Sequence, residues 1–334
     1  MVMDKVILGR TGHSVSRLGF GGLFVASFAA ERQAAIRTVH RALEHGINYF
    51  DTAPTYGDSE EVLGAALVGR SEPLIVSTKL GGRPNPFDPK DAKALVASVR
   101  TSLKLLGRER IELLMIHEPD RPQQYAWWDD FNAVTGPVLE VVERLKGEGL
   151  VGHVGIGGTT TTELAHLVRS GRFDVVLTAF QYNLLWREAA DEIFVAAREQ
   201  GIGVVAGSPL QQGTLSRRYD EVLSGPKPWW LSQRRIDQML KLYRLVEESG
   251  IPLPEMALRF VLSNPVVHSV LMGARSAAEV DANVAAVAKG PLPAALLARL
   301  DEIAAMLPQR PYGEPIALGW VFGAPQNYRG MASA

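Results

Sequence analysis

Short apolar runs alternate with longer segments of helical period along most of the chain. The runs are continuously apolar, which is typical of strands that are buried on both faces of a parallel sheet. Eight such strands are predicted, and they are Arg17–Gly21, Ile47–Asp51, Leu74–Lys79, Ile111–His117, Val151–Gly157, Val175–Phe180, Gly203–Ser208 and Val267–Gly273.

Each predicted strand is followed by a segment with helical period. These helices are Glu31–Glu44, Ser59–Leu67, Lys90–Leu106, Val138–Glu148, Thr161–Arg169, Ala189–Glu199, Arg235–Glu248 and Ala277–Ala288. Eight alternating strand–helix units favour an α/β fold of the closed (β/α)₈ type, the TIM barrel. Pro254–Ser263 and Pro293–Met306 are predicted as two extra helices.

Three stretches depart from this repeat. Val6–Val15, with Thr11-Gly12 at its turn, predicts a β-hairpin that plugs the barrel floor. The loop Gln211–Ser232 and the Pro- and Gly-rich tail 308–334 are long enough to favour a functional role, and we expect the tail over or near the barrel mouth. Because no change in composition separates the strands, we interpret residues 1–334 as a single domain.

Composition and charge argue against several classes of function. A formal net charge of -1 provides no basic surface for nucleic acid or an anionic membrane. No apolar run is long enough to span a bilayer, and no apolar signal-peptide core follows the first five residues, so we expect neither a membrane partner nor secretion. The chain has no cysteine, which excludes disulfides and thiolate catalysis and fits a reducing, cytoplasmic location.

Four chemically complementary side chains follow consecutive predicted strands. Asp51 and Tyr56 follow the second strand, Lys79 ends the third, and His117 ends the fourth. In a parallel barrel these positions share the mouth where active sites lie. A lysine beside a phenol favours the phenolate and lowers its pKa, an aspartate orients the lysine, and a histidine positions a carbonyl. The set suits protonation of the alkoxide that forms from a carbonyl, or the reverse from an alcohol, with hydride transfer carried by a cofactor.

Competing motifs are weak. Gly155-Ile156-Gly157-Gly158 lacks the third glycine of a dinucleotide-binding loop. His117-Glu118-Pro119-Asp120 does not have the spacing of a common metal site, so no metal is expected. His153 lies inside a predicted strand and is interpreted as a core residue.

Several motifs, in this order, resemble those of the aldo-keto reductase family over about residues 8–307. They are the run from Gly46 to Gly57, Leu114-Met115-Ile116-His117, Gln181-Tyr182-Asn183, and Ser208-Pro209-Leu210 followed by Gly213. The resemblance implies a catalytic tetrad of Asp51, Tyr56, Lys79 and His117, with Tyr56 as the acid–base group. It also implies an extended nicotinamide cofactor across the barrel mouth.

The resemblance implies a set of cofactor contacts that spans the strand ends. They are Gly21, Gly22, Asp51, Gly157, Gly158, Gln181, Ser208, Pro209, Leu210, Gln212, Gly213, Arg218, Gly273, Arg275, Glu279 and Asn283. Two positions depart from many relatives. Gly157-Gly158 replaces a Ser-Asn pair, which leaves Thr159, backbone groups or Gln181 to hold the carboxamide, and Ser208 replaces an aromatic residue that stacks on the nicotinamide.

The choice between NAD(H) and NADP(H) depends on charges around the last strand. Asn283 is similar to a family residue that faces the adenine, and Glu279 stands where NADP-preferring relatives carry a basic residue. A carboxylate there repels a 2′-phosphate and can accept ribose hydroxyls, which favours NAD(H) slightly. Arg275, Arg217 and Arg218 are the counterargument, since arginine binds phosphate well.

The substrate is expected to be a small carbonyl or sugar. Phe24 and the pairs Trp127-Trp128 and Trp229-Trp230 are predicted to line an aromatic pocket, because all six tryptophans follow strand ends or lie in the tail. Some of them are expected instead to pack loops or to join copies in a homo-oligomer, a state that the sequence leaves open. The resemblance leans towards bacterial sugar dehydrogenases over aldehyde or ketone reductases. The alternative is a regulatory or partner-binding barrel that binds cofactor without turnover.

Overall fold

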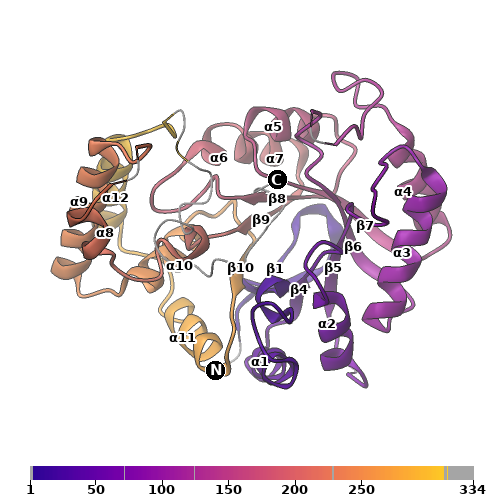
Figure 1. Cartoon of the computed structure of the whole chain (residues 1–334), viewed down its shortest axis with the longest axis horizontal. Helices are drawn as coiled ribbons and strands as arrows, with labels where there is room; N and C mark the ends of the chain where they lie inside the picture. Colours follow the sequence, from indigo (N-terminus) through magenta and orange to yellow (C-terminus); the bar gives the residue numbers. More distant parts are fainter. Residues whose placement is uncertain (1–2, 71, 124, 228, 312–313, 315–334) are drawn as a thin grey trace.

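The computed structural model describes residues 3–70, 72–123, 125–227, 229–311 and 314 (Figure 1). Within these residues, eight parallel strands close into a barrel in which β10 pairs with both β9 and β3. The strands are β3 (Leu18–Gly21), β4 (Tyr49–Asp51), β5 (Ile75–Leu80), β6 (Ile111–His117), β7 (Val151–Gly158), β8 (Val175–Ala179), β9 (Gly203–Gly207) and β10 (Ser269–Gly273). The barrel predicted from the sequence is confirmed.

The register brings the carboxyl ends of the strands to one rim. Gly21 pairs with both Asp51 and Gly273, and His117 pairs with Gly157. Residues that end different strands therefore face the same opening, as the barrel geometry requires.

Helices surround the barrel and begin close to their predicted starts. They are α1 (Arg32–Glu44), α2 (Ser59–Leu67), α3 (Ala92–Leu106), α4 (Pro137–Gly147), α5 (Thr162–Arg169), α6 (Glu188–Asp191), α7 (Ile193–Gln200), α8 (Asp220–Ser224), α9 (Gln233–Ser249), α10 (Leu253–Leu262), α11 (Ala277–Val287) and α12 (Ala294–Ala305). Side chains of Glu31, Asp91 and Ser276 accept backbone N–H groups at the starts of α1, α3 and α11, which explains these boundaries.

Two helix assignments differ from the sequence prediction. The helix α10, predicted as an extra element, packs against β10 and α11 and belongs to the outer ring. The helix α9, predicted as part of the ring, packs against α12 at one end of the molecule (Figure 1). Both helices are amphipathic, so their pattern alone did not show which one covers the barrel. The short α8 lies inside the predicted loop Gln211–Ser232 and was not predicted.

The N-terminal hairpin is present and closes the barrel floor. Strands β1 (Lys5–Ile7) and β2 (Ser14–Ser16) pair antiparallel. Leu8 and Val15 are fully buried in one cluster with Tyr49, Val175 and other side chains of the barrel interior. Gly9 lies so close to the start of β9 that an added Cβ would stand 2.1 Å from the nitrogen of Gly203.

Most of the tail lies outside the described residues, as does Trp320. Among the tail residues that are described, Glu314 forms a fully buried ion pair of 2.9 Å with Arg235 on α9. The placement of the tail over the mouth and the single-domain interpretation stay predictions. No helix of the described residues combines the length and apolar character that crossing a bilayer requires.

Candidate functional site

The four predicted tetrad side chains meet at the barrel mouth. Lys79 donates from Nζ to Oδ2 of Asp51 at 2.6 Å and to the carbonyl oxygen of Thr52 at 2.8 Å. Ser77 donates to the other Asp51 oxygen at 2.8 Å. Lys79 Nζ lies 4.8 Å from the centre of the Tyr56 ring, whose edge-on neighbour at 6.0 Å is the His117 ring. The strand ends thus bring a carboxylate, an ammonium, a phenol and an imidazole into one contact group.

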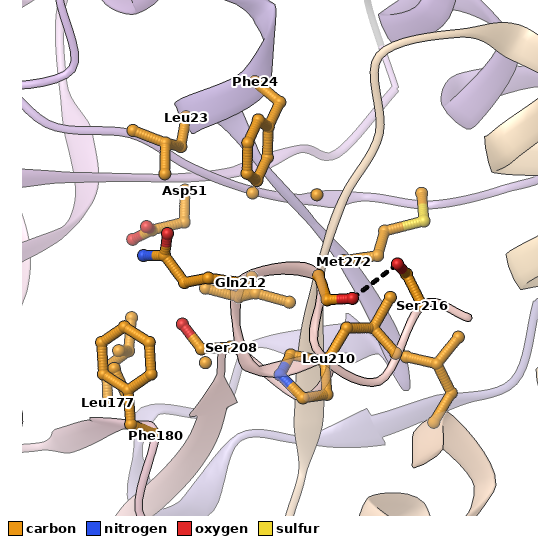
Figure 2. Close-up of a pocket in the computed structure, with 18 of the residues that line it drawn as sticks. Leu23, Phe24, Asp51, Leu177, Phe180, Ser208, Leu210, Gln212, Ser216 and Met272 are labelled. Atoms are coloured by element: carbon orange, nitrogen blue, oxygen red, sulfur yellow. Dashed lines mark hydrogen bonds between the residues drawn. The ribbon is translucent and has the colours of Figure 1, made fainter. Parts of the chain in front are cut away.

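A cavity of about 660 Å³ opens above this group. All four tetrad residues line it. Figure 2 shows Leu23 and Phe24 across the cavity from Phe180 and Leu210, and Ser208 and Gln212 also reach it. Its size and its mixture of apolar walls with a few polar groups are typical of small-molecule sites.

His117 is neutral in this environment. Burial, followed by the charge of Lys79, holds the pKa of its imidazole well below the usual 6.5. Its Nδ1 is buried without a hydrogen-bond partner among the described residues. Trp127 packs behind it and donates from its indole nitrogen to the His117 carbonyl oxygen at 3.0 Å. A neutral imidazole can donate one hydrogen bond to a carbonyl oxygen.

Tyr56 differs from the prediction in its electrostatics. Its side chain is partly accessible from the cavity, yet desolvation, followed by the charges of Asp51 and Glu118, raises the pKa of the phenol well above 10. The direction of this shift is opposite to the lowering expected from Lys79, because burial and two carboxylates set it. The phenol is therefore held protonated, which is the form that can give a proton to a carbonyl oxygen.

Glu118 is a cavity residue that the sequence analysis did not select. It follows His117 directly, at a positive φ of 51°, and its N–H donates to the Gly157 carbonyl oxygen at 2.8 Å. Burial and the charge of Asp120 raise the pKa of its carboxyl to about 7. The sequence analysis considered Glu118 only as part of a weak metal motif and assigned the catalytic role at this strand end to His117.

Left-handed backbone conformations gather around the cavity. Besides Glu118, they include Phe180 after β8 and Ser208, Gln211 and Gln212 after β9. Positive φ is costly for residues other than glycine and persists where the surrounding structure imposes it, often at functional sites. These turns direct Ser208 and Gln212 into the cavity (Figure 2).

Most residues predicted to contact the cofactor line this cavity. They are Gly21, Asp51, Gly157, Gly158, Ser208, Pro209, Leu210, Gln212, Gly213, Gly273, Arg275, Glu279 and Asn283. Gly22 is not among them, because it packs behind the mouth, where an added Cβ would stand 2.7 Å from Ser59 Oγ. Gln181 lies behind the rim and donates to the Thr159 carbonyl oxygen at 2.5 Å, while its Oε1 is buried with no partner among the described residues.

Of the two arginines after β9, Arg217 and not the predicted Arg218 lines the cavity. Arg218 pairs with Asp220 and with Glu247 and does not line the cavity. Arg217 lines it and stacks on Tyr219 at 3.7 Å. After the neighbouring strand β10, Glu279 accepts from the backbone N–H of Arg275 at 2.8 Å and from its guanidinium at 3.2 Å.

The tryptophans do not form the predicted aromatic pocket. Trp127 and Trp128 are buried beneath the loop after β6, and Trp128 donates to the Pro119 carbonyl oxygen at 2.7 Å. Trp229 is 86% exposed, and Trp230 packs against the core. None of the four lines the cavity, because the rings of Trp127 and Trp128 support the loop, Trp229 faces solvent and Trp230 faces the core. Of the predicted substrate residues, Phe24 alone does so.

The fold and the site define a class: barrel oxidoreductases that exchange hydride with a nicotinamide cofactor. Residues 17–305 match the family described as Aldo/keto reductase family. The chain belongs to this family.

Relatives and solved structures agree with this assignment. D-threo-aldose 1-dehydrogenase of Pseudomonas sp is 30% identical, over 87% of this chain and 94% of its own length. L-galactose dehydrogenase of Arabidopsis thaliana is 30% identical, over 96% of this chain and 98% of its own length. The NADH-specific methylglyoxal reductase of Escherichia coli is 28% identical, over 85% of this chain and 94% of its own length. An aldo-keto reductase from Bacillus halodurans, in its holo form, has a TM-score of 0.74 and 30% identity, over 93% of this chain and 100% of that one.

Proposed function

We propose that this protein transfers hydride between a nicotinamide cofactor and a small carbonyl or alcohol, with Tyr56 as the acid–base group. The observation that carries the proposal is the contact group of Tyr56, Lys79 and His117 at the floor of one cavity. The bound cofactor supplies or accepts the hydride. The regulatory alternative does not account for a buried 2.6 Å Lys79–Asp51 pair held against this phenol.

The chain's own residues handle the proton. In reduction, the protonated Tyr56 hydroxyl gives its proton to the carbonyl oxygen, which the neutral His117 imidazole holds by a hydrogen bond. The Lys79 ammonium then stabilises the phenolate that remains, and Asp51 keeps the ammonium oriented. In oxidation, the phenolate removes the alcohol proton.

The rim offers what a nicotinamide nucleotide requires. Gly157 lines the cavity without a side chain, and an added Cβ would come into ordinary contact, at 3.9 Å, with Leu177 and Lys79. Gln181 acts from behind this rim, where its side-chain nitrogen donates to the Thr159 carbonyl oxygen at 2.5 Å, and it is not placed among the direct contacts. Ser208, Gln212 and Gly213 provide polar and small groups on the side where the cofactor would lie. These residues, with Arg217 in place of Arg218, are the proposed cofactor contacts.

We lean towards NAD(H). Glu279 faces the cavity and already neutralises Arg275, which leaves less positive charge for a 2′-phosphate at this rim. Arg218 is withdrawn from the cavity by its two ion pairs. Arg217 remains at the cavity and is the basic group that could favour NADP(H).

The relatives named as aldose and galactose dehydrogenases support a sugar or a related hydroxylated carbonyl as substrate. We also propose a cytoplasmic location, which the lack of cysteine fits. A homo-oligomer stays a prediction, for which light scattering on the purified protein is the measurement.

The test is a screen of sugars, aldehydes and ketones with NAD⁺, NADH, NADP⁺ and NADPH. Turnover is measured from the change in absorbance of the reduced nicotinamide. We expect turnover with at least one hydroxylated aldehyde. Cofactor binding in a fluorescence titration, without turnover of any compound, would support the regulatory alternative instead.

A further inference from the structure

Glu118 presents a carboxylate to the reaction chamber that the tetrad does not use. It lines the cavity together with Tyr56 and His117 and is 6% exposed. Its charge acts on the Tyr56 phenol, which places it within electrostatic range of the reacting group. A buried carboxylate is stable only when it is paired or hydrogen-bonded, so the partners of each of its oxygens matter.

The protein engages only one side of this carboxylate. Thr159 donates from its hydroxyl to Oε2 at 2.9 Å, and the Arg121 guanidinium lies 3.1 Å from the same oxygen. Asp120 is occupied separately, by the N–H groups of Thr159 and Thr160 and by the Thr160 hydroxyl. Oε1 of Glu118 makes no hydrogen bond with the described residues, since both of these contacts are to Oε2.

We propose that Glu118 is a specificity-determining residue whose Oε1 accepts a hydrogen bond from a hydroxyl group of the substrate, so that the site selects hydroxylated carbonyl compounds. In its ionised form, present above its pKa of about 7, the Glu118 carboxylate only accepts hydrogen bonds, so its partner there is a donor. Arg121 already balances the charge, which favours a neutral hydroxyl over an ammonium group. A phosphate or carboxylate at this place would be repelled. The inference rests on the proposed function and names its substrate class.

The test compares two three-carbon aldehydes that differ in their hydroxyl groups, glyceraldehyde and propanal. The measured quantity is the ratio of kcat/KM for glyceraldehyde to that for propanal. Hydrogen bonds to charged groups contribute about 1.5–3 kcal/mol, so we expect Glu118→Leu to lower the ratio by about 10-fold or more. Glu118→Gln keeps an acceptor without the charge and should lower it by a smaller factor. Glu302→Gln, a surface change on α12, is the matched control and should leave the ratio as in the wild type.

Cofactor titration and thermal unfolding show which variants are folded. If Glu118→Leu does not fold, Glu118→Gln decides, with an expected loss of about 3-fold or more from a neutral bond replacing a charged one. A ratio equal to the wild-type value in a folded variant that still turns over propanal would overturn the role of Glu118 alone. No turnover of any compound of the carbonyl panel by the wild-type protein would overturn the proposed function, and the role of Glu118 with it.

Discussion

The carboxylate of Asp120 occupies the space that a side chain at Gly158 would need. An added Cβ at Gly158 would stand 2.4 Å from Oδ1 and 2.6 Å from Oδ2 of Asp120. The carboxylate holds the loop after β7 by accepting the N–H groups of Thr159 and Thr160. This explains why the chain carries glycine where many relatives carry asparagine.

The clash predicts a coupling between the two positions. Gly158→Asn should destabilise the protein by about 1–3 kcal/mol, because the buried carboxylate cannot move without breaking its hydrogen bonds. Asp120→Ala should also destabilise it, since two buried N–H groups lose their acceptor. In the double variant the asparagine side chain occupies the space that Asp120 leaves. The loss in free energy of unfolding, measured by urea unfolding, should therefore be smaller than the sum of the losses in the two single variants. Strict additivity would show that the two side chains do not compete for this space.

Tyr56→Phe removes the group that we assign to proton transfer. Because general acid–base groups contribute about 10²–10⁴-fold, we expect kcat to fall by this factor while cofactor affinity changes little. Tyr182→Phe is the matched control, since Tyr182 is a buried tyrosine outside the cavity. Steady-state turnover and a cofactor fluorescence titration measure the two effects. Near wild-type turnover in Tyr56→Phe would remove it from the mechanism.

Glu279→Gln tests the choice of cofactor. The substitution removes a negative charge from the rim and frees the Arg275 guanidinium from its ion pair. Two unit charges about 4 Å apart in water interact by about 1 kcal/mol, so we expect kcat/KM for NADPH relative to NADH to rise about 5-fold or more. Glu302→Gln should leave the ratio of kcat/KM for NADPH to that for NADH unchanged. If this ratio in Glu279→Gln equals the wild-type ratio, Glu279 does not face the ribose.

The titration of Glu118 predicts a dependence of stability on pH. Its folded pKa of about 7 lies above the ordinary 4.5 of the unfolded chain. Between these values the unfolded chain loses a proton that the folded protein keeps, so this group lowers stability as pH rises from 4.5 to 7. Desolvation and Asp120 favour the protonated form, while Arg121, Thr159 and Lys79 oppose it.

Glu118→Gln does not carry this titrating group. The melting temperature of the variant relative to the wild type should therefore increase between about pH 4.5 and about pH 8, by an amount that corresponds to at most about 3 kcal/mol. Calorimetry across this range is the measurement. A difference in melting temperature that is constant with pH would show that Glu118 is ionised in the folded protein throughout.

The periodic pattern was sufficient to predict the barrel, its hairpin and the strand ends that bear Asp51, Lys79 and His117. Strand ends of a parallel barrel always meet, so residues as far apart in the chain as Asp51 and His117 could be grouped from their sequence positions alone. The places of α9 and α10 could not be predicted in this way, because an amphipathic helix specifies an apolar face but not the partner that covers it.

The charge environment of a side chain and the direction in which it points could not be predicted from the sequence, because they depend on the tertiary structure. Trp127 and Trp128 follow a strand end, but only packing turned their rings beneath the loop and away from the cavity. The raised pKa of Tyr56 depends on burial and on the carboxylates of Asp51 and Glu118, which only the folded chain brings beside the phenol. The sequence by itself determined which groups reach the mouth of the barrel. Only the three-dimensional arrangement decided which of them face the cavity and in which protonation state, because desolvation and distance have no counterpart in residue order.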